Sequence, residues 1–200
     1  GNTELKGYSG IGQSSQLATI YGVKNAKNTL LAGFTTVRNV GAGSFSDVAL
    51  KEAINNGVVI GPTLFVSGPA LGITGGHCDS NLLPHEYNHQ SEGVVNSPWE
   101  ARKQVRKNRK FGADLIKFCA TGGVLSKNTD VNAKQFTLEE MQAIVDEAHN
   151  HGMRVAAHAH GLEGIRTAII AGVDSIEHSS FIDEATIQLA KERGTSLAMD

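Results

Sequence analysis

The sequence predicts a parallel α/β fold, and within that class a (β/α)8 TIM-type barrel. Short apolar runs typical of strands alternate with helical patterns along the whole chain, and no hairpin signal interrupts them. Polar side chains suited to catalysis follow several of these runs, as they do at the carboxyl ends of barrel strands. The sequence lacks the glycine signatures of nucleotide-binding doubly wound sheets, GxGxxG and GxxxxGKS/T. A complete open sheet stays the alternative, and the strand order decides between the two.

The first third of the chain alternates helix and strand. Apolar residues recur at helical spacing between Leu17 and Leu30, and Gly33 follows as a suitable helix end. Gly61 and Pro62 are turn residues that introduce a second strand. The spans expected here are a helix over residues 14–32, a strand over 34–40, a helix over 45–56 and a strand over 63–67.

Two helix starts in the second half carry capping signals. Ser97 stands before Pro98 and three residues before Glu100, a combination typical of a helix N-terminus. Thr137 and Glu140 form a second capping box. The spans expected here are a helix over residues 97–111, a strand over 114–120, a helix over 137–151, a strand over 154–159, a helix over 162–171, a strand over 173–178, a helix over 183–193 and a strand that begins at 196.

These spans give five complete strands and the start of a sixth, whereas a closed barrel needs eight. We therefore expect residues 1–200 to be the central portion of a single barrel domain that supplies about strands two to seven. Strand one and strand eight would lie outside the chain, and the barrel would be incomplete. A length of 200 residues with 40% hydrophobic content is enough for a core of this kind.

Lys117 lies inside the apolar run 114–120, and two later runs each end in a histidine, His158 and His178. A buried lysine must lose its proton, find a partner or react, so three such groups at successive strand ends indicate chemistry. Each residue alone also has a structural interpretation. The lysine stem can cover apolar neighbours while its ammonium stays in water, and His158 can be a core histidine that donates to a backbone carbonyl.

Composition excludes several partner classes. The 18 basic and 20 acidic residues nearly balance, and the basic residues between Arg102 and Lys110 suit a solvated helix face, so we expect no nucleic-acid partner. No run approaches the ~18 apolar residues of a membrane span and no leader opens the chain, so we expect no membrane association. Cys78 and Cys119 lack metal-pair spacing and cannot make a disulfide framework. A reducing compartment is therefore permitted, and we expect the cytoplasm.

Several short segments form a specific pattern when they are taken together. They are FTTVRNVG at 34–41, the Gly76 His77 loop, the Lys117 strand with Gly122 and Gly123, AHAHG at 157–161 and SIEH at 175–178. In this order they resemble the amidohydrolase superfamily over nearly the whole chain. Within it they are most similar to the prolidase-like and arginine-carboxypeptidase-like metallopeptidases related to imidazolonepropionase.

The resemblance implies a binuclear metal centre. In such enzymes the lysine at the end of barrel strand four is carbamylated by carbon dioxide and bridges two divalent metals, usually zinc, and here it would be Lys117. The histidines that close strands five and six bind one metal, which implies His158 and His178. The other metal needs an HxH pair from strand one and an aspartate, the general base, from strand eight. The chain has neither, since its HxH, His158 and His160, falls in the strand-five position.

The implied function is metal-dependent hydrolysis of an amide bond by a metal-activated hydroxide. Zinc lowers the pKa of bound water toward ~7 and polarises a carbonyl, while carbamylation turns lysine into an anionic oxygen donor. Two alternatives stay open. Lys117 could form a Schiff base in a class I aldolase-like barrel, or the chain could be an inactive barrel fragment without a completed site. If it were the full polypeptide, we would expect no activity.

The expected substrate is a small peptide or an N-acyl amino acid that loses its C-terminal amino acid or is split as a dipeptide. The expected assembly is a homo-oligomer. Residues 68–97 form the longest irregular stretch, and such loops inside a domain are usually functional or disordered. His77 and the amides of Gly75 and Gly76 could bind a substrate carboxylate there. A purely anchoring role for His77 is equally consistent with the sequence.

Overall fold

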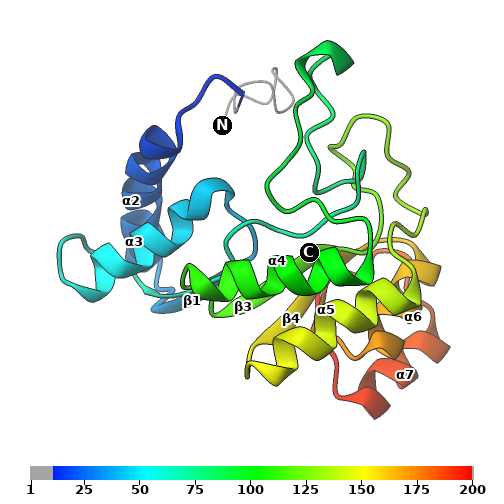
Figure 1. The fold of residues 1–200 in the computed structure, drawn as a ribbon. Helices are drawn as coiled ribbons and strands as arrows, with labels where there is room; N and C mark the ends of the chain where they lie inside the picture. The colour runs from blue at the N-terminus through cyan, green and yellow to red at the C-terminus, as the bar shows by residue number, and fades with distance from the viewer. Residues whose placement is uncertain (1–10, 200) are drawn as a thin grey trace.

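The computed structural model describes residues 11–199, which form six strands and the helices that separate them (Figure 1). The strands are β1 (Thr36–Asn39), β2 (Thr63–Val66), β3 (Leu115–Cys119), β4 (Arg154–Ala159), β5 (Ser175–His178) and β6 (Ser196–Ala198). They make a two-stranded sheet, β1-β2, and a four-stranded sheet in the order β3-β4-β5-β6. Every strand pair is parallel. The predicted parallel α/β class and strand count are therefore confirmed.

A helix separates each pair of consecutive strands, and neighbouring helices pack on one another. Four of them lie along the larger sheet, and the other two pack together at the opposite end of the molecule (Figure 1). None of the helices within residues 11–199 is long and apolar enough to cross a bilayer. The helices are α2 (Ser15–Leu31), α3 (Ser46–Asn55), α4 (Pro98–Lys110), α5 (Leu138–Asn150), α6 (Leu162–Ala171) and α7 (Glu184–Arg193).

Local capping chemistry fixes the starts of the later helices. Ser97 Oγ accepts a hydrogen bond from the Glu100 amide at 3.2 Å, as the sequence predicts. Thr137 and Glu140 complete the expected capping box at α5, each side chain accepting from the other's backbone amide. Each such cap satisfies an amide that would otherwise lack a partner at the helix N-terminus. The N-terminal boundaries of α4 and α5 therefore follow from the local sequence.

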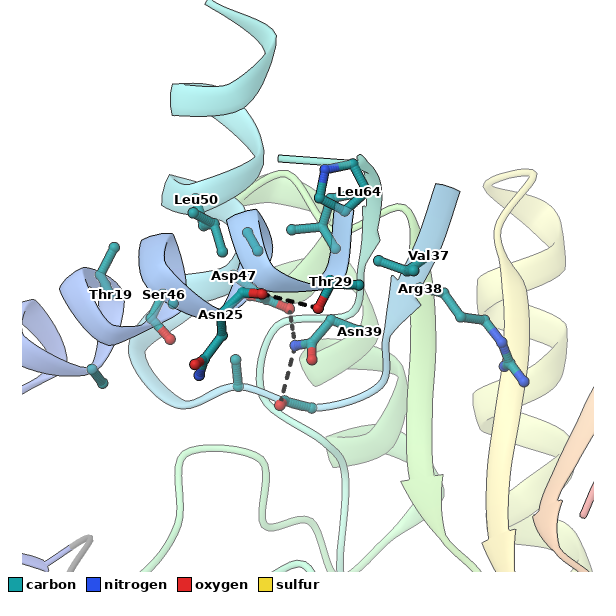
Figure 2. A pocket seen from close by; sticks show the side chains of 16 residues that line it. Thr19, Asn25, Thr29, Val37, Arg38, Asn39, Ser46, Asp47, Leu50 and Leu64 are labelled. Atoms are coloured by element: carbon teal, nitrogen blue, oxygen red, sulfur yellow. Dashed lines mark hydrogen bonds between the residues drawn. The ribbon is translucent and has the colours of Figure 1, made fainter. Parts of the chain in front are cut away.

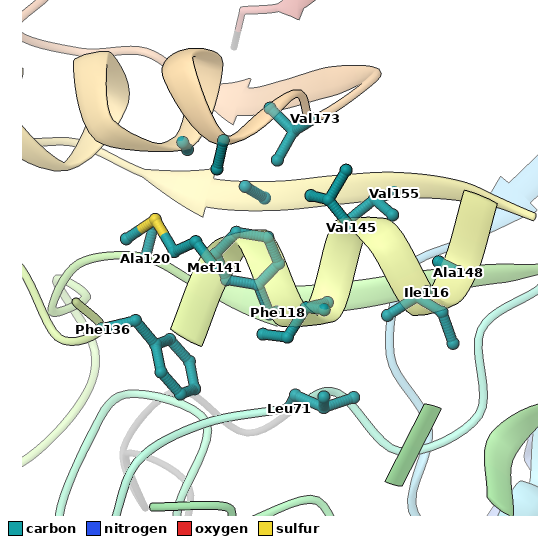
Figure 3. Packing of buried hydrophobic residues seen from close by; sticks show 14 of the residues in the cluster. Leu71, Ile116, Phe118, Ala120, Phe136, Met141, Val145, Ala148, Val155 and Val173 are labelled. Atoms are coloured by element: carbon teal, nitrogen blue, oxygen red, sulfur yellow. The ribbon is translucent and has the colours of Figure 1, made fainter. Parts of the chain in front are cut away.

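The main hydrophobic core lies between the larger sheet and its helices. Ile116, Phe118 and Val155 are no more than 1% exposed and belong to this core. Figure 3 shows Met141 of α5 packed close to Phe118. Because successive side chains of a strand point to opposite faces, Lys117 lies on the face turned away from these helices.

The two-stranded sheet has a much smaller core, made by Val48, Leu64 and Val66 with a few half-buried neighbours. A hollow of about 300 Å³ lies between α2, α3 and β1. Figure 2 shows Asn39 beside this hollow, where its Nδ2 donates to Asp47 Oδ2 and to a backbone carbonyl. The residues around the hollow do not include Lys117 or the histidines that follow it. The candidate metal ligands therefore lie in the better-packed half of the molecule, the one with the four-stranded sheet.

The two sheets touch without forming one continuous ladder. The Asp114 amide donates to the Val66 carbonyl at 2.7 Å, and Leu71 exchanges backbone hydrogen bonds with Lys117 and Cys119. Within the described residues, β1 and β6 each pair with one neighbouring strand only. The six strands thus have the parallel connectivity expected for part of a barrel, and they do not close into one.

Cys78 and Cys119 form a disulfide, with their Cα atoms 5.8 Å apart. This single bond was not predicted from the sequence, where only a metal pair and a disulfide framework were considered. Sequence spacing indicates only local geometry, whereas here the loop between β2 and β3 folds back onto the end of β3. Their 41-residue separation therefore becomes a direct contact.

Candidate metal centre

Three adjacent strands carry the residues that the sequence analysis singled out. Because β3, β4 and β5 are parallel neighbours, their carboxyl ends meet at one edge of the sheet. Cys119 is opposite His158 in the strand register, and Ala159 is opposite His178. Lys117 precedes Cys119 by two residues and so shares its face. The fold thus places Lys117, His158 and His178 at one end of the sheet.

Three imidazoles form a compact cluster at this edge. The ring centre of His158 lies 4.8 Å from that of His178 and 4.6 Å from that of His160. One ligand atom from each of the three histidines lies within 4.8 Å of the others. His158 is 3% exposed and His160 is 8% exposed, so the cluster is largely closed to solvent. Buried imidazoles at such spacing suit zinc, so these residues fit a metal ion.

His160 is the member of this cluster to which the sequence analysis assigned no role. Residues two apart in a strand share a face, so the HxH spacing was the signal that places His160 beside His158. Its Nδ1 lies 2.7 Å from Ser180 Oγ, and its ring stacks on that of His178. His160 therefore belongs to the metal-centre candidates or supports them.

The backbone turns sharply where β5 ends. His178 and Ser179 have φ values of 78° and 54°, in the left-handed region that residues other than glycine seldom adopt. Regular strand alternation would send the His178 side chain to the face opposite that of Glu177. The strand ends here instead, and the His178 ring contacts the rings of both His158 and His160, each with its centre 4.8 Å away. Such backbone outliers are found preferentially at functional sites.

His158 is neutral and has a defined tautomer. Burial, followed by the electrostatic effect of His77, lowers the pKa of His158 to about 3. Its Nε2 lies 3.1 Å from the Gly122 carbonyl oxygen. A carbonyl only accepts hydrogen bonds, so Nε2 carries the proton and Nδ1 keeps a free lone pair. A neutral imidazole oriented in this way is what a metal ligand requires.

Lys117 is 6% exposed. Burial lowers the pKa of Lys117 to about 8, with a further lowering by Arg38, while Glu177 opposes the shift. No hydrogen bond or ion pair to another residue of the described chain involves Lys117 Nζ. A substantial fraction of the amine is therefore neutral near pH 8, and only a neutral amine can react with carbon dioxide or a carbonyl.

His77 reaches the cluster from the loop between β2 and β3. Its ring centre lies 4.2 Å from that of His158, and its Nδ1 is hydrogen-bonded to Ser126 Oγ. A Cβ atom at Gly123 would lie 2.2 Å from the His77 ring, so a glycine is needed for this approach. Burial lowers the pKa of His77 to about 4, which leaves the ring neutral at pH 7.

The amides of Gly75 and Gly76, predicted to bind a substrate carboxylate, both have hydrogen-bond acceptors in their own loop. The Gly75 amide donates to Asp79 Oδ2 at 2.9 Å. The Gly76 amide donates to the Ile73 carbonyl at 2.9 Å. Both donors are used inside a tight turn that the Asp79 carboxylate stabilises, so a substrate carboxylate would have to displace these acceptors to bind there. Of the three residues proposed to contact substrate, His77 alone lies against the histidine cluster.

An ion pair that the sequence analysis did not predict joins β1 to β5. Arg38 of β1 donates to Ser175 Oγ at 3.0 Å and to Glu177 Oε2 at 2.8 Å, both on β5. Ser175 Oγ in turn donates to Glu177 Oε1 at 2.8 Å. Glu177 precedes His178 directly, so this pair joins the smaller sheet to the strand that carries a proposed metal ligand.

Solved structures of three hydrolases resemble this chain. A crystal structure of an Xaa-Pro dipeptidase with bound methionine is 42% identical, with a TM-score of 0.85 over 92% of this chain and 46% of that one. Aspergillus niger ochratoxinase has a TM-score of 0.87 at 32% identity, over 96% of this chain and 47% of that one. A prolidase complexed with N-methylphosphonate-L-proline has a TM-score of 0.81 at 36% identity, over 92% and 47%. The chain therefore spans just under half of each structure.

Sequence comparison agrees with these structures. Ochratoxinase of Aspergillus niger is 40% identical over 177 residues, which are 81% of this chain and 36% of that protein. The amidohydrolase family matches residues 4–200. The resemblance predicted from ordered strand-end motifs is thus confirmed, and the chain belongs to the amidohydrolase family.

Proposed function

We propose that the protein containing this chain is a metal-dependent hydrolase that cleaves the amide bond of a dipeptide or an N-acyl amino acid. The observation that carries the proposal is a buried lysine with a lowered pKa beside three imidazoles, all at the ends of adjacent parallel strands. The printed names of the relatives, an Xaa-Pro dipeptidase and a prolidase, support a peptide substrate. The whole protein would also contain the barrel strands that residues 11–199 do not supply.

Each proposed metal ligand has a separate role. Divalent metals, with zinc favoured by the imidazoles, would supply an activated water and polarise the substrate carbonyl when bound. His158 and His178 would hold one ion through neutral ring nitrogens. Lys117, once carbamylated by carbon dioxide, would offer two anionic oxygens and so bridge to a second ion. The second ion would require ligands from strands one and eight of the barrel.

His77 would contact the substrate as a neutral group. With its pKa near 4, its ring cannot serve at pH 7 as the cation for a substrate carboxylate. A neutral imidazole can still donate one hydrogen bond, and a site beside the metal ligands suits donation to the scissile carbonyl oxygen. The substrate carboxylate would then be bound by a group elsewhere in the whole protein.

The test uses the full polypeptide that contains this chain. Dipeptides ending in proline and N-acyl amino acids are assayed before and after chelation, and metal content is measured by inductively coupled plasma mass spectrometry. We expect hydrolysis that chelation abolishes and zinc with bicarbonate restores. Undiminished hydrolysis by metal-free protein would contradict the proposal. Trapping of a carbonyl substrate on Lys117 by borohydride would favour the Schiff-base alternative instead.

A further inference from the structure

A covalent link joins the His77 loop to the strand that carries Lys117. Cys119 is the last residue of β3, two residues beyond Lys117 and opposite His158 in the register. Its partner in the disulfide, Cys78, directly follows His77. The bond thus connects the His77 segment to the sheet at the level of the imidazole cluster.

The packing around Cys78 is tight. A Cβ atom at Gly72 would lie 2.7 Å from Cys78 Cβ and 3.2 Å from its backbone. Only a glycine at that position allows the loop to come close enough for Cys78 to reach Cys119. Cys119 is 2% exposed, while Cys78 is partly exposed and so open to a small reductant.

His77 packs against the His158 ring, and its hydrogen bonds lead to another loop. Its ring contacts Ser126, and its amide donates to Gln135 Oε1 at 3.0 Å. Both partners lie between β3 and α5, in a segment without regular helix or strand. The metal-ligand candidates, in contrast, stand on strands or at their ends, beside the main core. Loss of the disulfide would therefore loosen His77 and leave the imidazole cluster in place.

We propose that the Cys78–Cys119 disulfide is a positioning tether that holds His77 against the metal centre, so that its reduction impairs turnover without releasing metal. The effect on turnover rests on the proposed function, whereas the effect on the loop does not. In the oxidised protein the disulfide fixes the position of the His77 loop against β3. In the reduced protein His77 depends on its two hydrogen-bonding loop partners and on its contact with the His158 ring.

The reductant for the test is tris(2-carboxyethyl)phosphine, because a dithiol would also chelate the metal. The phosphine supplies two electrons and becomes the phosphine oxide with oxygen from water. The S–S bond breaks, and the two protons of that water end on the thiols of Cys78 and Cys119. Alkylation and mass spectrometry of the full polypeptide, purified without reductant, should find neither thiol free before treatment and both free after it.

Hydrogen exchange is the first readout. We expect amides of residues 73–81 to exchange about tenfold faster or more after reduction, with residues 154–159 unchanged. Metal content should stay constant. Equal exchange of residues 73–81 in both states would overturn the proposal, as would free thiols in the untreated protein. Metal loss with faster exchange across β4 would also overturn it, because the bond would then be supporting the sheet.

Steady-state kinetics is the second readout. Reduction should raise KM or lower kcat for a dipeptide by about tenfold, a change of the size expected when one oriented hydrogen bond is lost. The Cys78→Ser variant should behave like the reduced protein and show no response to phosphine. If this variant fails to fold, reduced wild-type protein gives the same comparison. Complete absence of hydrolysis in every state would refute the proposed function, and the exchange result would still decide on the tether.

Discussion

The two sheets of this chain differ in how well they are supported. The four-stranded sheet has a continuous buried core with α4–α7 and carries every proposed metal ligand. The two-stranded sheet has three buried core residues and a hollow beside α2, a helix that buries only Ala26 among its residues. Precise ligand placement requires side chains locked by packing, and the four-stranded sheet, which carries the proposed ligands, is the better packed of the two.

The two-stranded sheet nevertheless supports the proposed site through one long side chain. Arg38 of β1 reaches Glu177 of β5 with a 2.7 Å ion pair, so the weaker half is attached at the strand end that holds His178. The well-packed half with the four-stranded sheet carries the proposed ligands. The loosely packed half with the two-stranded sheet provides Arg38, whose charge pairs with Glu177. The following experiments separate these contributions.

The largest expected effect comes from Lys117→Ala in the four-stranded sheet. Removal of the proposed bridging ligand should lower kcat/KM roughly a thousandfold or more and abolish loading of two metals together. Activity assays and mass spectrometry of bound metal measure this. The matched control is Lys107→Ala on the exposed face of α4, which should leave both unchanged. Full activity and metal loading in Lys117→Ala would refute the role assigned to this residue.

Core truncations compare the two halves directly. Ile169→Ala in the large core should lower the free energy of unfolding by about 2–5 kcal/mol, because it leaves a cavity among fully buried side chains. Its neighbour on α6, Ile170, is 41% exposed, so Ile170→Ala should cost less than about 1 kcal/mol. Val48→Ala in the small core should fall between them. Urea unfolding followed by circular dichroism gives the order, and equal losses for Ile169 and Val48 would contradict the difference in packing.

The charge state of Lys117 predicts a pH dependence of stability. Its pKa falls from 10.5 to about 8 on folding, so between these pH values the unfolded state binds more protons. The metal-free protein should therefore gain about 3 kcal/mol of unfolding free energy as pH rises from 8 to 10.5. Denaturation curves of wild type and Lys117→Met isolate the contribution. A parallel pH dependence in both proteins would show that burial does not perturb this lysine.

The smallest expected effect concerns the support between the halves. Arg38→Met should cost about 1–2 kcal/mol, because it leaves the Glu177 carboxylate, 12% exposed, without its cation. Hydrogen exchange should rise more in β1 and β2 than in β3 and β4. Arg38→Lys should restore part of the loss, and Arg109→Met on α4 serves as an exposed control. Uniform exchange changes across both sheets would rule out a local supporting role.

The sequence predicts much of this fold because the signals are local. Ser97 and Thr137 start their helices as capping chemistry requires, and strand 154–159 has the bounds that its composition predicts. Lys117 and His158 share one face near the carboxyl ends of neighbouring parallel strands, a relation that alternating elements already imply.

The features that the sequence could not predict join distant positions. Arg38 meets Ser175 and Glu177 across 137 and 139 residues, and no periodicity relates such pairs. The Cys78–Cys119 bond likewise depends on the path of a long loop. The sequence also did not indicate that the Gly75 amide donates to the Asp79 carboxylate, four residues later in the chain.

The long reach of Arg38 also bears on how the chain is made. During synthesis β1 and β2 emerge early, whereas Glu177 leaves the ribosome only after more than a hundred further residues. Until then Arg38 lacks its acceptors on β5, and the small core is the main support of the two-stranded sheet. The nascent β1–β2 segment therefore passes through a stage of synthesis without its β5 partner, when exposed strand edges favour aggregation.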